Sequence, residues 1–257
     1  MATALVTGGT SGIGAAFARA LAARGDDLVL VARDAERLAE MAAEIKERYA
    51  VDVEILTADL GDRDDTLRVA DRVASAEQPI DLLVNNAGFG VHTRLTAADS
   101  SPHEYALDVM CRAVLILAAA AGRAMTARGH GAIVNVSSTA GFVTMGSYSA
   151  IKAWATSFSE GLAVELAGTG VTVTALCPGY VRTEFHQRAE INASKIPGPA
   201  WLDADELVAG CLEDVARQRV ISIPSARWKV AIFLARHAPR RAIRAFSAKL
   251  SSGRRTG

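Results

Sequence analysis

Short apolar runs recur along the chain, and most are continuous stretches of leucine and β-branched residues without polar alternation. Such runs are typical of strands that are covered on both faces, as in a parallel sheet. The segments predicted as strands are Ala4–Thr7, Leu28–Val31, Val53–Thr57, Leu82–Asn85, Ile133–Ser137, Val171–Cys177 and Val220–Ile223.

Longer segments with helical spacing separate these runs. In one of them Asp34 is a suitable N-cap, and Leu38, Met41 and Ile45 fall on one face. The alternation of strands and helices with short links predicts an α/β fold: a Rossmann-type, doubly wound, parallel seven-stranded sheet with helices on both faces. The predicted helices are Gly12–Ala23, Asp34–Tyr49, Asp62–Ala74, Ser101–Ala127, Tyr148–Leu166 and Asp203–Gln218.

Charge is balanced in total but not along the chain. The 257 residues hold 28 Lys and Arg against 28 Asp and Glu, and 50% are hydrophobic. This composition argues against a nucleic-acid-binding protein and against disorder. No acidic residue follows Asp214, however, whereas 11 basic residues do. We therefore expect a catalytic and dinucleotide-binding domain over residues 1–225 and a basic, amphipathic helical extension, 226–257, packed on it.

Cysteine and histidine positions suggest neither a disulfide framework nor a metal site. The three cysteines are widely spaced, and the five histidines lack ligand spacing. No signal peptide is recognisable, and the longest apolar run, Ala113–Ala121, is far shorter than the ~20 residues of a membrane span. We expect a cytoplasmic protein without a metal.

A glycine-rich segment follows the first strand and opens the first helix. Its glycines, Gly8, Gly12 and Gly14, have G-x-x-x-G-x-G spacing. Glycine lets the backbone approach a pyrophosphate closely, and the helix N-terminus then offers free N–H groups. An ordinary tight turn is the alternative, but the strand–loop–helix context favours dinucleotide binding. The residues predicted to bind the cofactor here are Gly8, Thr10, Ser11, Gly12, Ile13 and Gly14.

The end of the second strand bears on the choice between NAD and NADP. An NAD site usually has an acidic residue there to hold the ribose 2′-hydroxyl. In this chain Ala32 occupies that position and Arg33 follows. A guanidinium can pair with a 2′-phosphate, so we favour NADP(H) over NAD. Alternatively, Arg33 is a solvated surface charge.

Taken together, the motifs resemble those of the short-chain dehydrogenase/reductase family in its simple, single-domain form. The resemblance runs from Thr7 to Thr183, and all six motifs stand in the family's order at the ends of predicted strands. The matching segments are Thr7–Gly14, Asp59-Leu60, Asn85–Gly88, Ser137-Ser138, Tyr148–Lys152 and Pro178–Thr183.

Tyr148 and Lys152 form the candidate catalytic pair. Four residues apart on a helix, they share one face. A phenol is a poor base at neutral pH, but a neighbouring ammonium lowers its pKa. Tyr148 could then act as general acid–base while a hydride moves to or from the nicotinamide. Chance occurrence of Tyr-x-x-x-Lys is the alternative.

The resemblance implies roles for further residues. Ser138, rather than Ser137, would hydrogen-bond the reacting oxygen, and Lys152 would also hold the nicotinamide ribose. Asp59 would contact adenine, and Asn86 would line the cofactor site. Implied as cofactor-binding are Arg33, Asp59, Leu60, Asn86, Ala87, Gly88, Tyr148, Lys152, Pro178, Gly179, Val181 and Thr183.

The chain departs from the family pattern at two places. Ser138 and Tyr148 are 10 positions apart, fewer than in many members. Met110 occupies a position that often holds an asparagine of a proton relay behind the lysine. A thioether cannot donate a hydrogen bond, so the relay would be broken or rerouted.

The substrate side is read as largely apolar. The segment Glu184–Leu202 matches the family's substrate cover and is interpreted as a mobile lid. No charged cluster suggests an anionic substrate, so we expect a lipophilic carbonyl or alcohol. Further wall residues are expected to be Phe89, Val91, Phe142, Val143 and Met145.

The basic tail allows two interpretations. Its second helix, after Pro239, has Ile243, Phe246 and Leu250 on one side and basic residues around the rest. Such a helix either contacts an anionic membrane surface or packs on the domain and shields the cleft. The resemblance also implies a homodimer or homotetramer, paired through Ser101–Ala127 and Tyr148–Leu166.

These observations predict an NADP(H)-dependent oxidoreductase that transfers a hydride between the nicotinamide and a carbonyl or secondary alcohol. Two alternatives stay open. A catalytically weak nucleotide-binding or scaffold protein of the same fold is favoured only by Met110. A sugar-nucleotide epimerase or dehydratase also uses Tyr-x-x-x-Lys but usually carries an added substrate domain.

Overall fold

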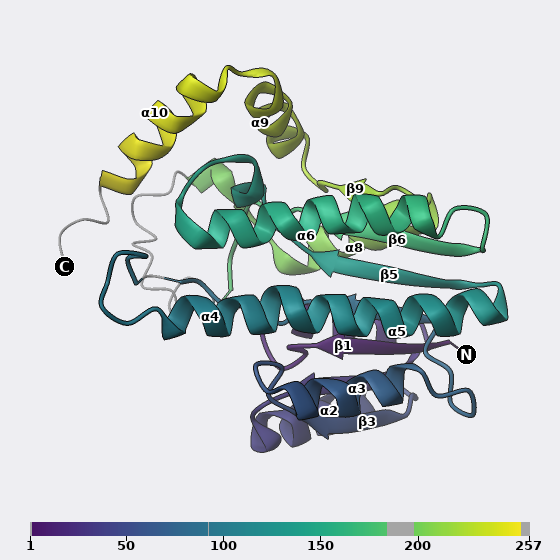
Figure 1. Cartoon of the computed structure of the whole chain (residues 1–257). Helices are drawn as coiled ribbons and strands as arrows, with labels where there is room; N and C mark the ends of the chain where they lie inside the picture. Colours follow the sequence, from purple (N-terminus) through teal and green to yellow (C-terminus); the bar gives the residue numbers. More distant parts are fainter. Residues whose placement is uncertain (1, 92, 184–197, 253–257) are drawn as a thin grey trace.

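The computed structural model describes residues 2–91, 93–183 and 198–252. Within them, seven parallel strands form one sheet in the order β3-β2-β1-β4-β5-β6-β9 (Figure 1). The order reverses direction between β1 and β4, as in a doubly wound fold. The sheet confirms the predicted fold class and all seven predicted strands. Their bounds are β1 Thr3–Thr7, β2 Asp27–Ala32, β3 Val53–Thr57, β4 Leu82–Asn85, β5 Gly131–Val136, β6 Val171–Leu176 and β9 Ile221–Ser222.

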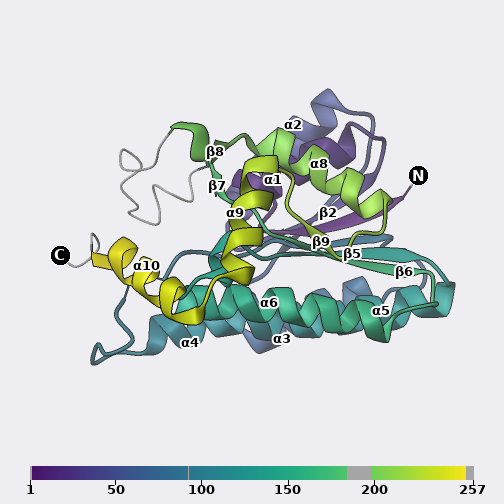
Figure 2. The same ribbon diagram turned by 90° about the horizontal axis from the view of Figure 1, so that it is seen from above.

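Helices cover both faces of the sheet (Figure 2). Two apolar clusters, one on each face, bury the continuous hydrophobic runs of the strands. The first face carries α1 (Gly12–Ala22), α2 (Ala35–Arg48) and α8 (Ala204–Ala216). The second carries α3 (Arg63–Val73), α4 (Ser101–Leu107), α5 (Ala113–Arg128) and α6 (Gly146–Glu165).

Burial explains the strand pattern. In the central strands Leu5, Val6 and Leu30 are fully buried, because helices lie above and below them. The outer strand β3 instead alternates between covered and exposed positions, and Ile55 is 40% exposed. Continuous apolar runs therefore mark the interior of the sheet and alternation marks its edge.

The predicted helix Ser101–Ala127 is present as one helical stretch, Ser101–Arg128, whose hydrogen-bonding pattern changes part-way along. Residues Asp108–Arg112 form a π-helical turn, η1, between α4 and α5. The stretch Ser101–Arg128 is long and apolar enough to cross a membrane, but 56% of its most apolar window is buried inside the fold. Its hydrophobicity is therefore accounted for by packing in the core.

The chain after β6 builds one side of the strand ends. A two-stranded sheet pairs β7 (Tyr180–Val181) with β8 (Trp201–Leu202), which the sequence did not predict. The short helices are η2 (Thr139–Phe142) and η4 (Gly198–Ala200). The basic tail forms α9 (Ala226–His237) and α10 (Arg240–Ser252), which stand together beyond β9 (Figure 1).

Candidate active site

Loops at the carboxyl ends of the strands enclose a cleft of about 1220 Å³. Ligands of open α/β sheets bind at this edge. The cleft brings together segments that are far apart in the sequence, and every predicted site residue except Gly14 lies on its wall. These residues are Gly8, Thr10, Ser11, Gly12, Ile13, Arg33, Asp59, Leu60, Asn86, Ala87, Gly88, Ser138, Tyr148, Lys152, Pro178, Gly179, Val181 and Thr183.

The glycine-rich loop has the conformation that the spacing predicts. Gly8 and Gly12 have positive φ angles of 66° and 54°, which favour glycine. Gly14 has a different role: a Cβ there would lie 2.1 Å from the Gly8 carbonyl oxygen and 2.4 Å from Asn86 Nδ2. Gly14 therefore permits close packing beneath the loop.

Asn86 and Thr7 clamp this loop to the end of β4. The side-chain amide of Asn86 donates to the carbonyl oxygen of Thr7 at 2.9 Å. The Thr7 hydroxyl accepts hydrogen bonds from the backbone N–H groups of Asn86 and Ala87 at 2.9 and 3.0 Å. Asn86 thus shapes the cradle through its side chain, a contribution that the sequence did not reveal.

Ser138, Tyr148 and Lys152 meet at the centre of the cleft. Ser138 follows β5, and its hydroxyl accepts a 3.1 Å hydrogen bond from the N–H of Ala140. Lys152 lies one helical turn beyond Tyr148 on α6, with Nζ 5.7 Å from the centroid of the phenol ring. Lys152 Nζ donates to the carbonyl oxygen of Val136 at 2.8 Å.

Burial controls the titration of this pair. Desolvation raises the pKa of Tyr148 to about 12, and a hydrogen bond with Ser138 opposes this rise. Desolvation also lowers the pKa of Lys152 to about 8, opposed by the nearby thiols of Cys111 and Cys177. The expected lowering of the tyrosine pKa by the lysine is therefore not the dominant effect here, because removal from water outweighs it.

Ser137 supports Lys152 from behind. Its buried hydroxyl donates to the backbone carbonyl of Lys152 at 2.6 Å and lies 2.7 Å from the hydroxyl of Thr156. Thr156 bonds to the same carbonyl at 3.1 Å. The two serines therefore have different roles. Ser138 lies beside Tyr148, and Ser137 fixes the backbone of α6.

Met110 lies in the π-helical turn and is 2% exposed. A Cβ on Gly88 would lie 3.0 Å from the Met110 sulfur and 3.6 Å from Lys152 Nζ. The thioether and the ammonium are therefore neighbours above this glycine. The Met110 side chain thus occupies the space next to Lys152 in which other family members often have a relay asparagine.

At the β2–β3 end of the cleft, Arg33 and Arg37 both line the wall. Asp34 caps α2 by accepting from the N–H of Arg37, which confirms its predicted role. Arg33 donates to the hydroxyl of Tyr105 at 2.8 Å, and this hydroxyl donates to Asp59 at 2.7 Å. The sequence did not single out Arg37 or Tyr105, whose relevance depends on contacts between distant segments.

Comparison with known proteins identifies the family. A family model described as short chain dehydrogenase matches residues 2–193. The chain belongs to the short-chain dehydrogenase family. An uncharacterized oxidoreductase of Staphylococcus saprophyticus is 37% identical over 195 residues, covering 75% of this chain and 83% of that protein.

Two solved structures extend the likeness. A short-chain dehydrogenase from Sphingobium yanoikuyae in complex with NADPH has 37% identity and a TM-score of 0.83, over 90% of this chain and 92% of that one. A bulky-bulky ketone specific alcohol dehydrogenase from Comamonas testosteroni has 31% identity and a TM-score of 0.80, over 94% and 98%. This short-chain dehydrogenase is accordingly an NAD(P)-dependent oxidoreductase.

The residues present fit a nicotinamide dinucleotide. Positive-φ glycines form the turn before α1, whose N-cap residue Ser11 makes no side-chain capping bond. Backbone N–H groups at this end are therefore oriented for a phosphate. A Cβ on Gly12 would lie 3.2 Å from Thr183, so added bulk would narrow the cradle.

Apolar side chains line much of the remaining wall of the cleft. Phe89, Val91, Val143 and Met145 lie on it as predicted, whereas Phe142 does not and instead stacks with Arg236. Most of the predicted lid, Glu184–Leu202, lies outside the described residues. The tail helices contribute wall residues that the motifs did not reveal: Trp228, Ala231, Ile232, Ala235 and Phe246.

Proposed function

We propose that the protein is an NADP(H)-dependent oxidoreductase that interconverts a lipophilic carbonyl compound and its secondary alcohol. The observation that carries this proposal is the meeting of Ser138, Tyr148 and Lys152 in a cleft that is also lined by many apolar side chains. The glycine-rich cradle lies at one end of this cleft, so a cofactor and a substrate could be bound side by side.

Each catalytic side chain has one task in this proposal. When bound, the nicotinamide supplies or accepts the hydride. Tyr148 is protonated at neutral pH, since the ordinary pKa of a phenol is about 10 and burial raises that of Tyr148 further, and it can therefore donate a proton to a developing alkoxide. Ser138 holds the same oxygen, and Lys152 orients the ribose.

Arginine at the β2–β3 end supports the preference for NADP. Arg33 and Arg37 line this part of the wall, whereas Asp34 is engaged in capping α2. Arginine presents several N–H donors to a phosphate. Asp34 also lines the cleft, but its Oδ1 is engaged by the N–H of Arg37 at 3.1 Å. The relative from Sphingobium yanoikuyae, which was solved with NADPH, agrees with this choice.

The substrate proposal depends on the tail helices. Trp228, Ile232 and Phe246 add aromatic and aliphatic surface opposite the catalytic residues. Such a wall favours apolar groups on both sides of the carbonyl carbon. The relative from Comamonas testosteroni is named for bulky ketones, which is consistent with a roomy apolar cleft.

Kinetics on a panel of hydrophobic ketones tests the proposal. Oxidation of NADPH should occur with wild type and fall by at least about 100-fold in Tyr148→Phe, since general acid–base catalysis typically contributes 10²–10⁴-fold. Binding of NADPH, followed by its fluorescence, should persist in the variant, because the glycine-rich loop and Lys152 are intact. Equal turnover by both proteins would contradict the catalytic role of Tyr148. Turnover by neither protein would favour a nucleotide-binding scaffold.

We also propose a cytoplasmic homo-oligomer, with residues 226–257 as an extension of the catalytic domain 1–225. Exposed apolar side chains on the outer faces of α4, α5 and α6 support pairing, namely Leu107, Leu115 and Val164. Light scattering should give a dimer or tetramer. A monomeric mass at micromolar concentration would contradict this.

A second proposal concerns the outer face of α9. Val230, Phe233 and Leu234 are 61–62% exposed and form one stripe at helical spacing. Lys229 and Arg236 flank this stripe, and no acid lies in the tail. A stripe of this kind suits the surface of an anionic bilayer. We propose that α9 contacts such a membrane while its inner face closes the cleft.

Vesicle co-sedimentation tests this second proposal. Wild type should bind vesicles containing phosphatidylserine more strongly than neutral ones, and replacing Val230, Phe233 and Leu234 by serine should abolish binding. Serine at Ile55 and Leu67, which are 40% exposed elsewhere, serves as control. Retained binding by the triple variant would refute the proposal, and a changed oligomeric mass would identify a protein interface instead.

A further inference from the structure

Tyr105 occupies a bridging position at the β2–β3 end of the cleft. Its hydroxyl accepts a hydrogen bond from Arg33 Nη1 at 2.8 Å and donates one to Asp59 Oδ1 at 2.7 Å. The three residues come from separate segments: Arg33 follows β2, Asp59 follows β3, and Tyr105 lies on α4. One phenol thus connects a cation and a carboxylate across the cleft wall.

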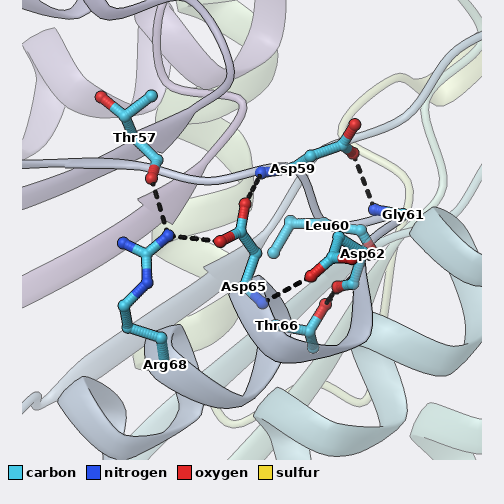
Figure 3. Close-up of polar contacts among 8 residues, drawn as sticks. All are labelled: Thr57, Asp59, Leu60, Gly61, Asp62, Asp65, Thr66 and Arg68. Atoms are coloured by element: carbon cyan, nitrogen blue, oxygen red, sulfur yellow. Dashed lines mark hydrogen bonds and ion pairs between the residues drawn. The ribbon is translucent and has the colours of Figure 1, made fainter.

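The carboxylate that accepts this hydrogen bond is rigidly held (Figure 3). Asp59 Oδ1 also accepts from the N–H of Gly61 at 2.8 Å, and the N–H of Asp59 donates to Asp65 at 2.7 Å. Asp65 in turn pairs with Arg68. The hydrogen bond from the N–H of Asp59 and the contact with Arg68 together hold the pKa of Asp65 below its usual range. Asp59 therefore presents a fixed acceptor to Tyr105.

The ring of Tyr105 is fixed as well. It stacks on Phe89, with 5.4 Å between centroids and 28° between planes. On another side it lies against Gly61, where a Cβ would come 2.0 Å from Cε2 of the ring. Any other residue at position 61 would displace the ring, so Gly61 is required for this arrangement.

Arg33, in contrast, is an exposed side chain, and an exposed arginine ordinarily samples many rotamers. The hydrogen bond to Tyr105 restricts it to the cleft wall and leaves its other N–H donors available. The hydroxyl also separates the guanidinium from Asp59, so the cation is not paired directly with that carboxylate. Both effects favour the binding of an added anion.

We propose that Tyr105 is a positioning residue that sets cofactor specificity by holding Arg33 for the 2′-phosphate of NADP(H). This inference rests on the proposed NADP preference. A phenylalanine at position 105 would keep the stacking on Phe89, the packing on Gly61 and the ring that lies 5.9 Å from the Arg33 guanidinium. It would remove only the hydrogen bond that fixes Arg33 Nη1. Affinity for the 2′-phosphate should then fall, whereas affinity for the rest of the nucleotide should not.

Calorimetric titration of the full-length chain with 2′,5′-ADP and with 5′-AMP isolates this effect without catalysis. Tyr105→Phe should weaken binding of 2′,5′-ADP by about fivefold, as expected for the loss of one modest hydrogen bond. Binding of 5′-AMP should stay within about twofold, because Asp59 Oδ1 loses the Tyr105 hydrogen bond but keeps the one from the N–H of Gly61. In an Arg33→Ala background, Tyr105→Phe should have no further effect. Tyr49→Phe, beside Arg48 at the far end of α2, is the matched control.

The outcomes separate this inference from the proposal beneath it. A wild type that binds 5′-AMP and 2′,5′-ADP equally would refute the NADP preference and the role of Tyr105 together. A wild-type preference that survives Tyr105→Phe would refute only the role of Tyr105. Equal losses for both ligands would indicate a purely structural residue. Gly61→Ala, which keeps the hydroxyl but displaces the ring, should reproduce the selective loss.

Discussion

Two glycine-to-alanine substitutions, both in helices, should have opposite effects on stability. In α1, a Cβ on Gly14 would lie 2.1 Å from the Gly8 oxygen and 2.4 Å from Asn86 Nδ2. Relief requires movements of the order of 1 Å in backbone that is clamped to β4. In α6, a Cβ on the exposed Gly161 would meet no atom within 4 Å.

The magnitudes follow from these contacts. Gly161→Ala should raise the free energy of unfolding by roughly 0.5–1 kcal/mol, because alanine restricts the unfolded chain and favours helix. Gly14→Ala gains the same stabilisation from helix preference but incurs an overpacking cost of about 1–3 kcal/mol. We expect this cost to lie near the upper end of the range, because rigid backbone must shift. We expect a net loss of roughly 1–2 kcal/mol and weaker nucleotide binding.

Urea unfolding, followed by circular dichroism, measures both free energies, and NADPH titration measures the effect on the cradle. Gly161→Ala should bind NADPH as wild type does. The reasoning would be refuted if Gly14→Ala were as stable as Gly161→Ala and bound nucleotide equally well, since the loop would then tolerate a Cβ that the packing excludes.

Three further predictions concern the surroundings of Lys152. Its pKa is lowered to about 8, so between pH 8 and 10.5 the unfolded chain binds a proton that the folded chain lacks. Raising the pH through this window should increase the free energy of unfolding of wild type by ~3 kcal/mol relative to that of Lys152→Met, measured by urea unfolding. The same pH dependence in both proteins would contradict this. Ser137→Ala should lower the free energy of unfolding by about 1–2 kcal/mol, because a buried hydrogen bond is lost, whereas exposed Ser157→Ala should change it little. Met110→Asn places an amide beside the ammonium and should shift the pH–rate profile of ketone reduction to higher pH, at a stability cost of about 1–3 kcal/mol; an unchanged profile would show that protons reach Tyr148 by another route.

The local pattern of apolar and polar residues was sufficient to predict most of the fold. The seven strands were predicted within a few residues, because both-face burial produces continuous apolar runs that the sequence displays. The N-cap of α2 was also predicted, since Asp34 accepts from the N–H of Arg37 three residues ahead. The small sheet of β7 and β8 was missed, because two-residue strands leave no periodic signal.

The candidate site was only partly readable. Ser138, Tyr148 and Lys152 stood in motifs, and the cleft brings them together. The roles of Ser137 and Asn86 were not visible, because each depends on a carbonyl oxygen supplied by a distant segment. The direction of the Tyr148 pKa shift was also missed, since spacing on a helix reveals a neighbouring charge but not the loss of solvent.

The sequence by itself determined the doubly wound sheet, the glycine-rich turn and the candidate catalytic set, because each is encoded by residues close together in the chain. Only the tertiary structure decided which side chains surround them. Tyr105 meets Arg33 and Asp59, Met110 meets Lys152, and the inner face of α9 closes the cleft. The physical reason is the same in each case: hydrogen bonding and desolvation depend on distances that are set by the packing of helices from remote segments.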